Sequence, residues 1–244
     1  MITHETWLAQ FLNAHLAGLG NSLLALLHRT AADPKEPWAD YIVMQILVAF
    51  IMVTLFALLR SSLSVDKPGT LQHLFEMIHE FIKGQGDDQM GHDAHHHIFI
   101  FETFFIFILF SNLIGIIPGF MSPTQVVYVP AGLALLSFAY YNFQGLKKHP
   151  IQYGKHFLGP IPAMAPLMLP IEIISHLARP LSLTIRLFAN MYAGEQLTIV
   201  FLSLTYLVGP VVFMGLHVFV SLLQSYIFVL LSMIYVGGAI AEEH

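Results

Sequence analysis

The sequence predicts an all-α polytopic membrane protein, with about five membrane-crossing helices and further amphipathic helices at the membrane surface. Hydrophobic residues make up 56% of the 244 residues, charged residues make up only 10%, and the mean hydropathy is +0.70. Long apolar segments alternate with short polar ones along most of the chain. This composition excludes a soluble domain of this size.

Two further features of the composition limit the possible functions. The chain has no Cys, so it has neither a disulfide framework nor a thiolate metal site. Its net charge is −5 and its basic residues are scattered, which argues against a nucleic-acid partner. We expect no cofactor and no bound metal.

The first 38 residues are predicted to form an N-terminal extracytoplasmic segment that precedes a membrane domain over residues 39–244. Apolar residues recur in this segment at helical spacing, which is typical of an amphipathic helix lying on a membrane surface. An Asp-Pro-Lys-Glu-Pro loop follows at residues 33–37. The apolar positions are Leu8, Phe11, Leu12, Leu16, Leu19, Leu23 and Leu26.

The membrane domain begins with an apolar crossing near residues 41–60, which ends at Arg60. Residues 70–83 alternate apolar and charged positions and are too short and too polar to cross, so an interfacial helix is predicted there. Residues 84–97 are rich in Gly, Asp and His and are interpreted as a polar loop. The same His and Asp residues could bind a divalent metal, but no second ligand set supports this alternative.

Four further crossings are predicted near residues 98–117, 126–146, 163–206 and 210–241. The last two are too long to cross the membrane along its normal. The 44 residues of 163–206 would span about 66 Å as a continuous helix, against a hydrocarbon core of about 30 Å. These two helices are therefore expected to form a long, strongly tilted hairpin.

The distribution of Lys and Arg predicts the topology. These residues follow the first and third crossings, whereas the turns near residues 118–123 and 205–210 have none. By the positive-inside rule the basic segments are cytoplasmic, which places the N-terminus outside and, after five crossings, the C-terminus inside.

A single cation, Arg186, lies deep within the fourth crossing, with apolar sequence on both sides. A charged side chain at this depth costs about 2.5–3.5 kcal/mol on insertion scales, so an Arg there indicates a functional site. On a helix, Ser182 and Asn190 share the Arg186 face, Glu172 lies within about 40° of it, and Glu195 points to the opposite side. The small residues Ala189, Ala193 and Gly194 are positions where another helix can pack closely.

The last crossing has a polar stripe that includes His217 and Gln224. A hairpin folded about residue 206 brings Glu195 and His217 to the same depth, so we interpret them as a proton relay open to the outer face. The same construction places Arg186 one turn from Gln224, whose amide oxygen could accept a hydrogen bond from the guanidinium. Ordinary interhelical hydrogen bonding remains the alternative for the uncharged polar residues Gln224, Asn190 and Ser182.

These residues carry a resemblance to a known family. The run SLTIRLFANMYAGE (182–195), with His217 and Gln224 seven residues apart, resembles subunit a of the F-type rotary ATP synthase. The resemblance extends to FSNLIGIIPG (110–119) and SPT (122–124). One departure is Ala189, where the family more often has Gly.

The resemblance implies a proton-translocating stator subunit, not catalytic by itself, in a bacterial inner or plasma membrane. It implies that Arg186 is the essential charge facing the carboxylates of a c-subunit ring, and that subunit b, the remainder of the complex, lipid and protons are the other partners. Glu195, His217, Gln224 and Asn112 would belong to an outer half-channel. Glu172, Ser182 and Asn190 would belong to an inner one.

Two alternatives are weaker. A stand-alone ion channel or secondary transporter would have an internal repeat with paired broken helices. The second half of this sequence does not repeat the pattern of the first. An intramembrane hydrolase needs a nucleophile with a base or a metal, and the sequence has no Cys, no His-Glu-x-x-His and no Gly-x-Ser-x-Gly. It also has no Gly-x-x-x-x-Gly-Lys-Ser/Thr nucleotide loop.

Overall fold

The computed structural model describes residues 6–26, 33–64, 67–117, 119–148, 165–204 and 208–240. They contain seven α-helices joined by short 3₁₀ turns and no β-strand, which confirms the predicted all-α fold. The helices are α1 (Trp7–Leu26), α2 (Asp40–Ser62), α3 (Thr70–Met90), α4 (Ile98–Leu113), α5 (Tyr128–Lys148), α7 (Ala165–Leu204) and α8 (Val208–Ile240).

Each of the five predicted crossings corresponds to one helix, namely α2, α4, α5, α7 and α8. Three segments in the described part of the chain are long and apolar enough by composition alone to cross a membrane: Asp40–Ser62, Ile98–Ile116 and Val211–Ile240. α5 and α7 carry more polar side chains within their spans.

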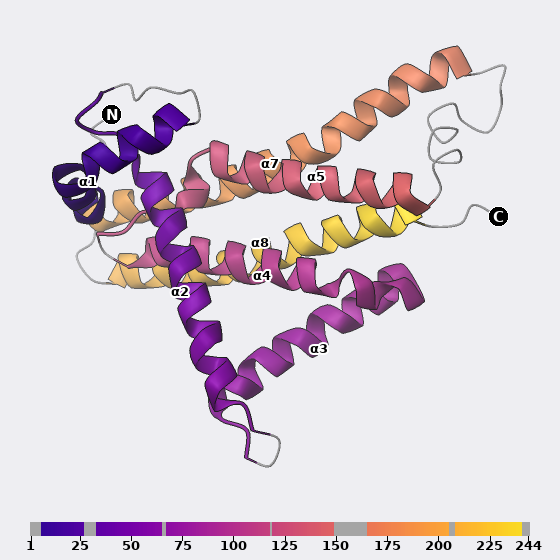
Figure 1. Cartoon of the computed structure of the whole chain (residues 1–244), viewed down its shortest axis with the longest axis horizontal. Coiled ribbons are helices and arrows are strands. Elements are labelled where there is room, and N and C mark those ends of the chain that lie inside the picture. The colour runs from indigo at the N-terminus through magenta and orange to yellow at the C-terminus, as the bar shows by residue number, and fades with distance from the viewer. Residues whose placement is uncertain are drawn as a thin grey trace.

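Four helices, α4, α5, α7 and α8, lie alongside one another as a bundle, and α2 runs across this bundle at a steep angle (Figure 1). The 40 residues of α7 and the 33 residues of α8 form continuous helices. A helix of about 60 Å fits a core of about 30 Å only if it is inclined by roughly 60° from the membrane normal. The tilt of these two helices in a membrane stays a prediction from their lengths.

Two prolines, Pro170 and Pro180, lie inside α7 without ending it. A proline removes one backbone hydrogen bond, and neighbouring helices and hydroxyl side chains compensate for this within a membrane. Because the helix continues through both prolines, positions before and after Pro180 can be compared on one helical wheel.

The predicted interfacial helix at 70–83 is too short, because α3 continues to Met90. The predicted polar loop at 84–97 was therefore wrong. Packing explains the difference, since Gly86 lies close to Ala94 and Ile98, and a Cβ at Gly237 of α8 would be only 2.7 Å from the Gln89 carbonyl oxygen. Of the glycines that favour a loop locally, Gly86 is thus a position of helix contact, whereas an added Cβ at Gly84 would have no described atom within 4 Å.

The chain then turns at Gly91, which has a positive φ of 59°, and forms a 3₁₀ turn over Gly91–His96. This turn is held against the C-terminal half of α5. Asp93 pairs with Lys148, and His97 forms a 2.6 Å hydrogen bond with the Tyr140 hydroxyl. The bond from Lys148 holds the pKa of Asp93 below its ordinary value, whereas burial lowers the pKa of His97.

The core of the bundle lies where α4, α5, α7 and α8 meet. One apolar cluster joins α3, α4, α5 and α8, and a second joins α4, α5, α7 and α8. α1 stands apart from this core and is joined to the start of α2 by Thr6–Asp40 and Asn13–Trp38 hydrogen bonds. The helix predicted within the first 38 residues is confirmed, with a kink at Leu16.

Candidate functional site

The candidate site is the contact between α7 and α8. α7 buries Leu183, Leu187 and Met191 against the bundle, and the Arg186 side of the helix lies next to this buried stripe. α8 buries the predicted stripe, which is polar in its first half. The stripe was predicted to consist of His217, Ser221, Gln224, Phe228 and Tyr235; the first four are buried and Tyr235 is partly buried.

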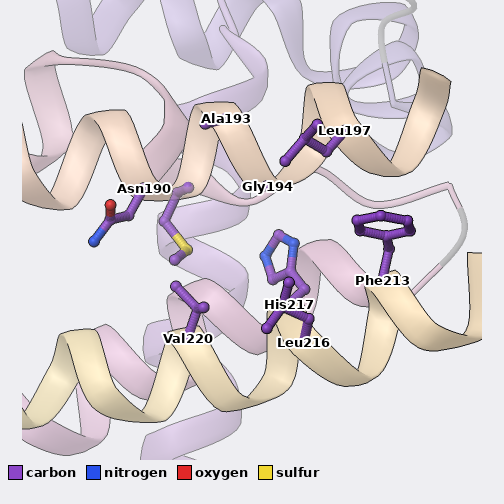
Figure 2. Close-up of a pocket in the computed structure, with 9 residues that line it drawn as sticks. Asn190, Ala193, Gly194, Leu197, Phe213, Leu216, His217 and Val220 are labelled. Atoms are coloured by element: carbon purple, nitrogen blue, oxygen red, sulfur yellow. The ribbon is translucent and has the colours of Figure 1, made fainter. Parts of the chain in front are cut away.

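His217 points from α8 toward α7 and meets it at Gly194 (Figure 2). A Cβ at Gly194 would lie 3.0 Å from the His217 Nδ1 and 3.3 Å from its Cε1, so only glycine leaves full room for the imidazole. The His217 Nε2 is buried and has no hydrogen-bond partner within the described residues. An unsatisfied buried nitrogen of this kind is normally paired with water or with a group that arrives from elsewhere.

A cavity of about 180 Å³ lies beside His217 between the two helices. Asn190 lines one end and Phe213 the other, and Figure 2 shows the imidazole between them. A water needs about 10–15 Å³ of such volume and two to four polar partners. The cavity therefore has room for several waters, and the His217 and Asn190 side chains supply polar partners. Its lining is completed by Met191, Ala193, Gly194, Leu197, Leu216 and Val220.

Glu195 follows Gly194 directly, so the expected match in depth between Glu195 and His217 agrees with the contact of His217 at Gly194. The two side chains are not hydrogen-bonded or ion-paired with each other in the described structure. Glu195 is partly buried and lies on the other side of α7 from Arg186, as the helical spacing predicts. A direct bond between Glu195 and His217 is thus absent, and a relay between them requires water.

Gln224 is bonded to Asn190 instead of Arg186. The Asn190 Nδ2 donates to the Gln224 Oε1 at 2.8 Å across the α7–α8 interface. The expected Arg186–Gln224 bond was wrong, because a hairpin diagram gives the depth of each residue but not the rotation of each helix. Asn190 and Gln224 were also expected in different half-channels, and their bond joins them at one position between the helices.

The Arg186 guanidinium has one hydrogen bond in the described residues, from Nη2 to the Ser182 hydroxyl at 3.4 Å. No carboxylate of these residues forms an ion pair with it. Next to it along the helix, Ala189 and Ala193 are exposed. This is an unneutralised cation on a partly exposed helix face with small neighbours, and such a face allows close approach of another helix.

Asn112 lies in a buried polar cluster at the end of α4. Its Oδ1 accepts from the Thr124 hydroxyl at 2.6 Å, and the Ser122 hydroxyl donates to the Ser111 carbonyl at 2.9 Å. The Asn112 Nδ2 and the Ser111 hydroxyl are buried without a partner in the described residues. The 3₁₀ turn Pro123–Gln125 carries this cluster to the side of α7.

Glu172 is partly buried near the start of α7 and has no ion pair in the part of the chain described. Between Glu172 and Arg186 the structure reveals a group that the sequence analysis missed. His176 bonds to Asn142 of α5, and the Arg179 guanidinium lies over the rings of Tyr235 and Tyr141, at 5.2 and 6.0 Å from their centroids. The spacing signal was present, because Glu172, Arg179 and Arg186 are seven residues apart.

The described residues contain no group of three or more His, Asp or Glu side chains placed to hold a metal ion. The His-rich stretch after Gly91 is arranged instead by hydrogen bonds and ring contacts. His95 and His96 have ring centroids 3.8 Å apart, and His97 bonds to Tyr140.

Comparison with known proteins gives the family. Residues 42–237 match the family model described as the ATP synthase A chain. The chain is 58% identical over 233 residues to the ATP synthase subunit a of Solibacter usitatus, which covers 95% of this chain and 99% of the relative. It is 46% identical over 242 residues to the ATP synthase subunit a of Koribacter versatilis, covering 99% of each chain. This chain is a polytopic membrane protein and belongs to the ATP synthase A chain family.

Proposed function

We propose that this chain is the proton-translocating stator subunit of a rotary F-type ATP synthase. In this role it provides two offset aqueous half-channels, separated by Arg186, that lead protons to and from carboxylates on a moving ring of c subunits. The observation that carries the proposal is Arg186 itself. It is a cation within a membrane helix with no carboxylate partner in the described residues, on a face where small residues leave room for another helix.

The chemistry of arginine suits this role. Its side chain remains protonated in any protein site, so its charge is permanent. A deprotonated carboxylate that passes on the ring can pair with it, and a proton that would cross directly between the two half-channels is repelled. The chain has no carboxylate at the Arg186 contact in the described residues, so the moving carboxylate comes from a partner.

The outer half-channel in this proposal passes the cavity beside His217. The unpaired His217 Nε2, the cavity volume and the nearby Glu195 support a water-filled relay there. The Asn190–Gln224 bond marks its inner end, one helical turn from Arg186. The buried cluster around Asn112 would lie along the outer path, where its unpaired amide nitrogen can donate to water.

The inner half-channel would begin near Glu172 and reach Arg186 along the same side of α7, past Ser182. Glu172 and Arg186 are fourteen residues apart, which is about 21 Å along a helix and about 40° around it. The continuity of α7 through Pro180 supports this shared side.

In the proposed topology, residues 39–244 form the membrane domain of a bacterial inner membrane, with the N-terminal segment outside and the C-terminus in the cytoplasm. The Lys147–Lys148 pair at the end of α5 marks the cytoplasmic side. The partners are the c-subunit ring, subunit b and the rest of the complex.

The test of this function uses the complete ATP synthase complex, reconstituted in liposomes with this chain. Replacing Glu195 by Gln should reduce ATP-driven proton pumping, and Arg186→Ala should abolish it, while both complexes still assemble. A complex that pumps normally with Arg186→Ala contradicts the proposed function.

A further inference from the structure

A titratable side chain that the proposed function does not use lies between Glu172 and Arg186. His176 is one helical turn after Glu172 and ten residues before Arg186. At 100° per residue, Glu172, His176 and Arg186 fall within an arc of about 80° on α7. His176 therefore lies on the side of the helix along which the inner half-channel is proposed to run.

The position of His176 along the membrane agrees with an inward location. It contacts Tyr141 and Asn142 of α5, which lie one to two turns before the Lys147–Lys148 end of that helix. This basic end is cytoplasmic by the positive-inside rule. Thus His176 is nearer to the cytoplasmic side than Arg186 is.

Hydrogen bonds fix which ring nitrogen of neutral His176 carries the proton. The Asn142 Nδ2 donates to the Phe138 carbonyl at 2.7 Å, so the Asn142 Oδ1 faces the imidazole. His176 Nε2 is 2.9 Å from this oxygen. An amide oxygen can only accept, so Nε2 is the protonated nitrogen and Nδ1 the basic one.

The surroundings hold the imidazole in place and supply a second polar group. The ring packs edge-to-face on Phe138 and Tyr141, with centroid distances of 5.0 and 5.3 Å. The Tyr141 hydroxyl oxygen is 3.5 Å from Nδ1 and 3.4 Å from Nε2. A ring held in this way can take up and release a proton without changing its position.

The titratable and charged groups around His176 come from three helices. Tyr141 faces it from α5, Glu172 and Arg179 flank it along α7, and Tyr235 of α8 lies under the Arg179 guanidinium. Arg179 is held by aromatic faces and forms no ion pair within the described residues, so its charge is not neutralised there. Among these residue types, histidine is the one whose ordinary pKa lies between about pH 5 and 8.

We propose that His176 is a proton-carrying residue of the inward path, positioned by Asn142 and Tyr141. Its Nδ1 takes up a proton from a water on the cytoplasmic side, and the imidazolium then releases that proton to water on the side of Arg186. The neutral ring is restored and no other reactant is consumed. During ATP synthesis the same transfer runs in reverse. This inference rests on the proposed function, because it assigns a carrier to the inner half-channel.

The test uses the complete complex reconstituted in liposomes. It asks whether the rate of ATP-driven proton pumping depends on the pH of the medium or on the pH of the lumen. During ATP-driven pumping the inner path faces the medium, so medium pH is varied from about 5 to 8, the range in which histidine titrates, with luminal pH fixed. Wild type should show an inflection in pumping rate, and His176→Gln should lose it while the complex assembles normally. The matched control His73→Gln, on the exposed side of α3, should keep the inflection.

A second variant tests the chemistry if His176→Gln fails to assemble. Asn142→Asp keeps an acceptor at the same atom but adds a negative charge, which favours the imidazolium. The inflection should then move to higher pH by about one unit or more. A purely structural His176 predicts no movement, so an unshifted inflection in Asn142→Asp overturns the proposal.

A third variant, Glu195→Gln, distinguishes a failure of this inference from a failure of the proposed function. Glu195→Gln should change the dependence on luminal pH and leave the dependence on medium pH as in wild type. If Glu195→Gln behaves so and His176→Gln retains the medium-side inflection, the assignment of His176 is wrong and the half-channels stand. If Glu195→Gln shows no such sidedness, the proposed function itself fails.

Discussion

The contact between Gly194 and His217 provides a quantitative test of the α7–α8 interface. A methyl group at position 194 would lie 3.0 Å from the His217 Nδ1 and 3.3 Å from Cε1, which is closer than ordinary van der Waals contact. Gly194→Ala therefore forces the imidazole to shift by a few tenths of an ångström. Overpacking of this kind typically costs about 1–3 kcal/mol.

A matched control is available on the facing helix. A Cβ at Gly215 has no atom within 4 Å, so Gly215→Ala adds the same methyl group to open space. In a helix this change stabilises by about 0.5–1 kcal/mol through backbone entropy, and Gly194→Ala receives the same gain. The difference between the two variants isolates the contact with His217, and we expect Gly194→Ala to be less stable than Gly215→Ala by about 1–3 kcal/mol.

The assay compares the thermal unfolding of the two purified complexes and their ATP-driven proton pumping. Gly215→Ala should match or exceed the wild-type unfolding temperature and pump normally. Gly194→Ala should unfold at a lower temperature and pump more slowly, since the displaced imidazole narrows the cavity. Equal stability and equal pumping in the two variants would refute the placement of His217 against Gly194.

Three further predictions concern separate parts of the structure. Replacing Asn190 and Gln224 by Leu, singly and together, should give a coupling energy of about 0.5–1.5 kcal/mol in a double-mutant cycle of thermal stability, and additive effects would contradict their hydrogen bond. Burial lowers the pKa of His97 in the folded protein below its ordinary value of 6.5. The contribution of the buried neutral imidazole to the free energy of unfolding is therefore complete above pH 6.5, and it is lost as the pH falls toward the folded-state pKa. Wild type should therefore lose more stability between about pH 7 and 5 than His97→Asn does, and parallel pH profiles would show that His97 is not buried in its neutral form. Gly237→Ala should displace the end of α3, because its Cβ would be 2.7 Å from the Gln89 carbonyl oxygen, and faster protease cleavage near Met90 than in Gly238→Ala is the expected readout; equal cleavage would contradict the α3–α8 contact.

Much of the fold could be predicted because hydrophobic length identifies membrane helices. The sequence placed the long helix at 163–206, and the structure gives Ala165–Leu204. The hairpin was also predicted to be tilted from length alone. The error at α3 has a different origin, since Gly84, Gly86 and Asp87 favour a loop locally while packing on Ala94 and α8 favours a helix. That tertiary contact could not be predicted from the residues of this segment alone.

The candidate site was predicted in part for similar reasons. Residue counts from the turn brought Glu195 and His217 to one depth, and the structure places His217 against the residue before Glu195. Counting could not give the rotation of α7 against α8, which is why the Gln224 amide was assigned to Arg186 and not to Asn190. The roles of these residues in proton transfer stay predictions. The His176 cluster was missed because Asn142 and Tyr141 come from a third helix.

If Arg186 separates two half-channels, its replacement should uncouple proton flux from ATP hydrolysis. Proton flux through the complete complex in liposomes is measured for wild type, Arg186→Lys and Arg186→Ala, with ATP and then under an imposed membrane potential without ATP. Arg186→Ala should lose ATP-driven pumping while passive proton leak persists or increases, because the barrier between the half-channels is gone. Normal pumping by Arg186→Ala with no added leak would show that Arg186 is a structural residue and not the barrier between two half-channels.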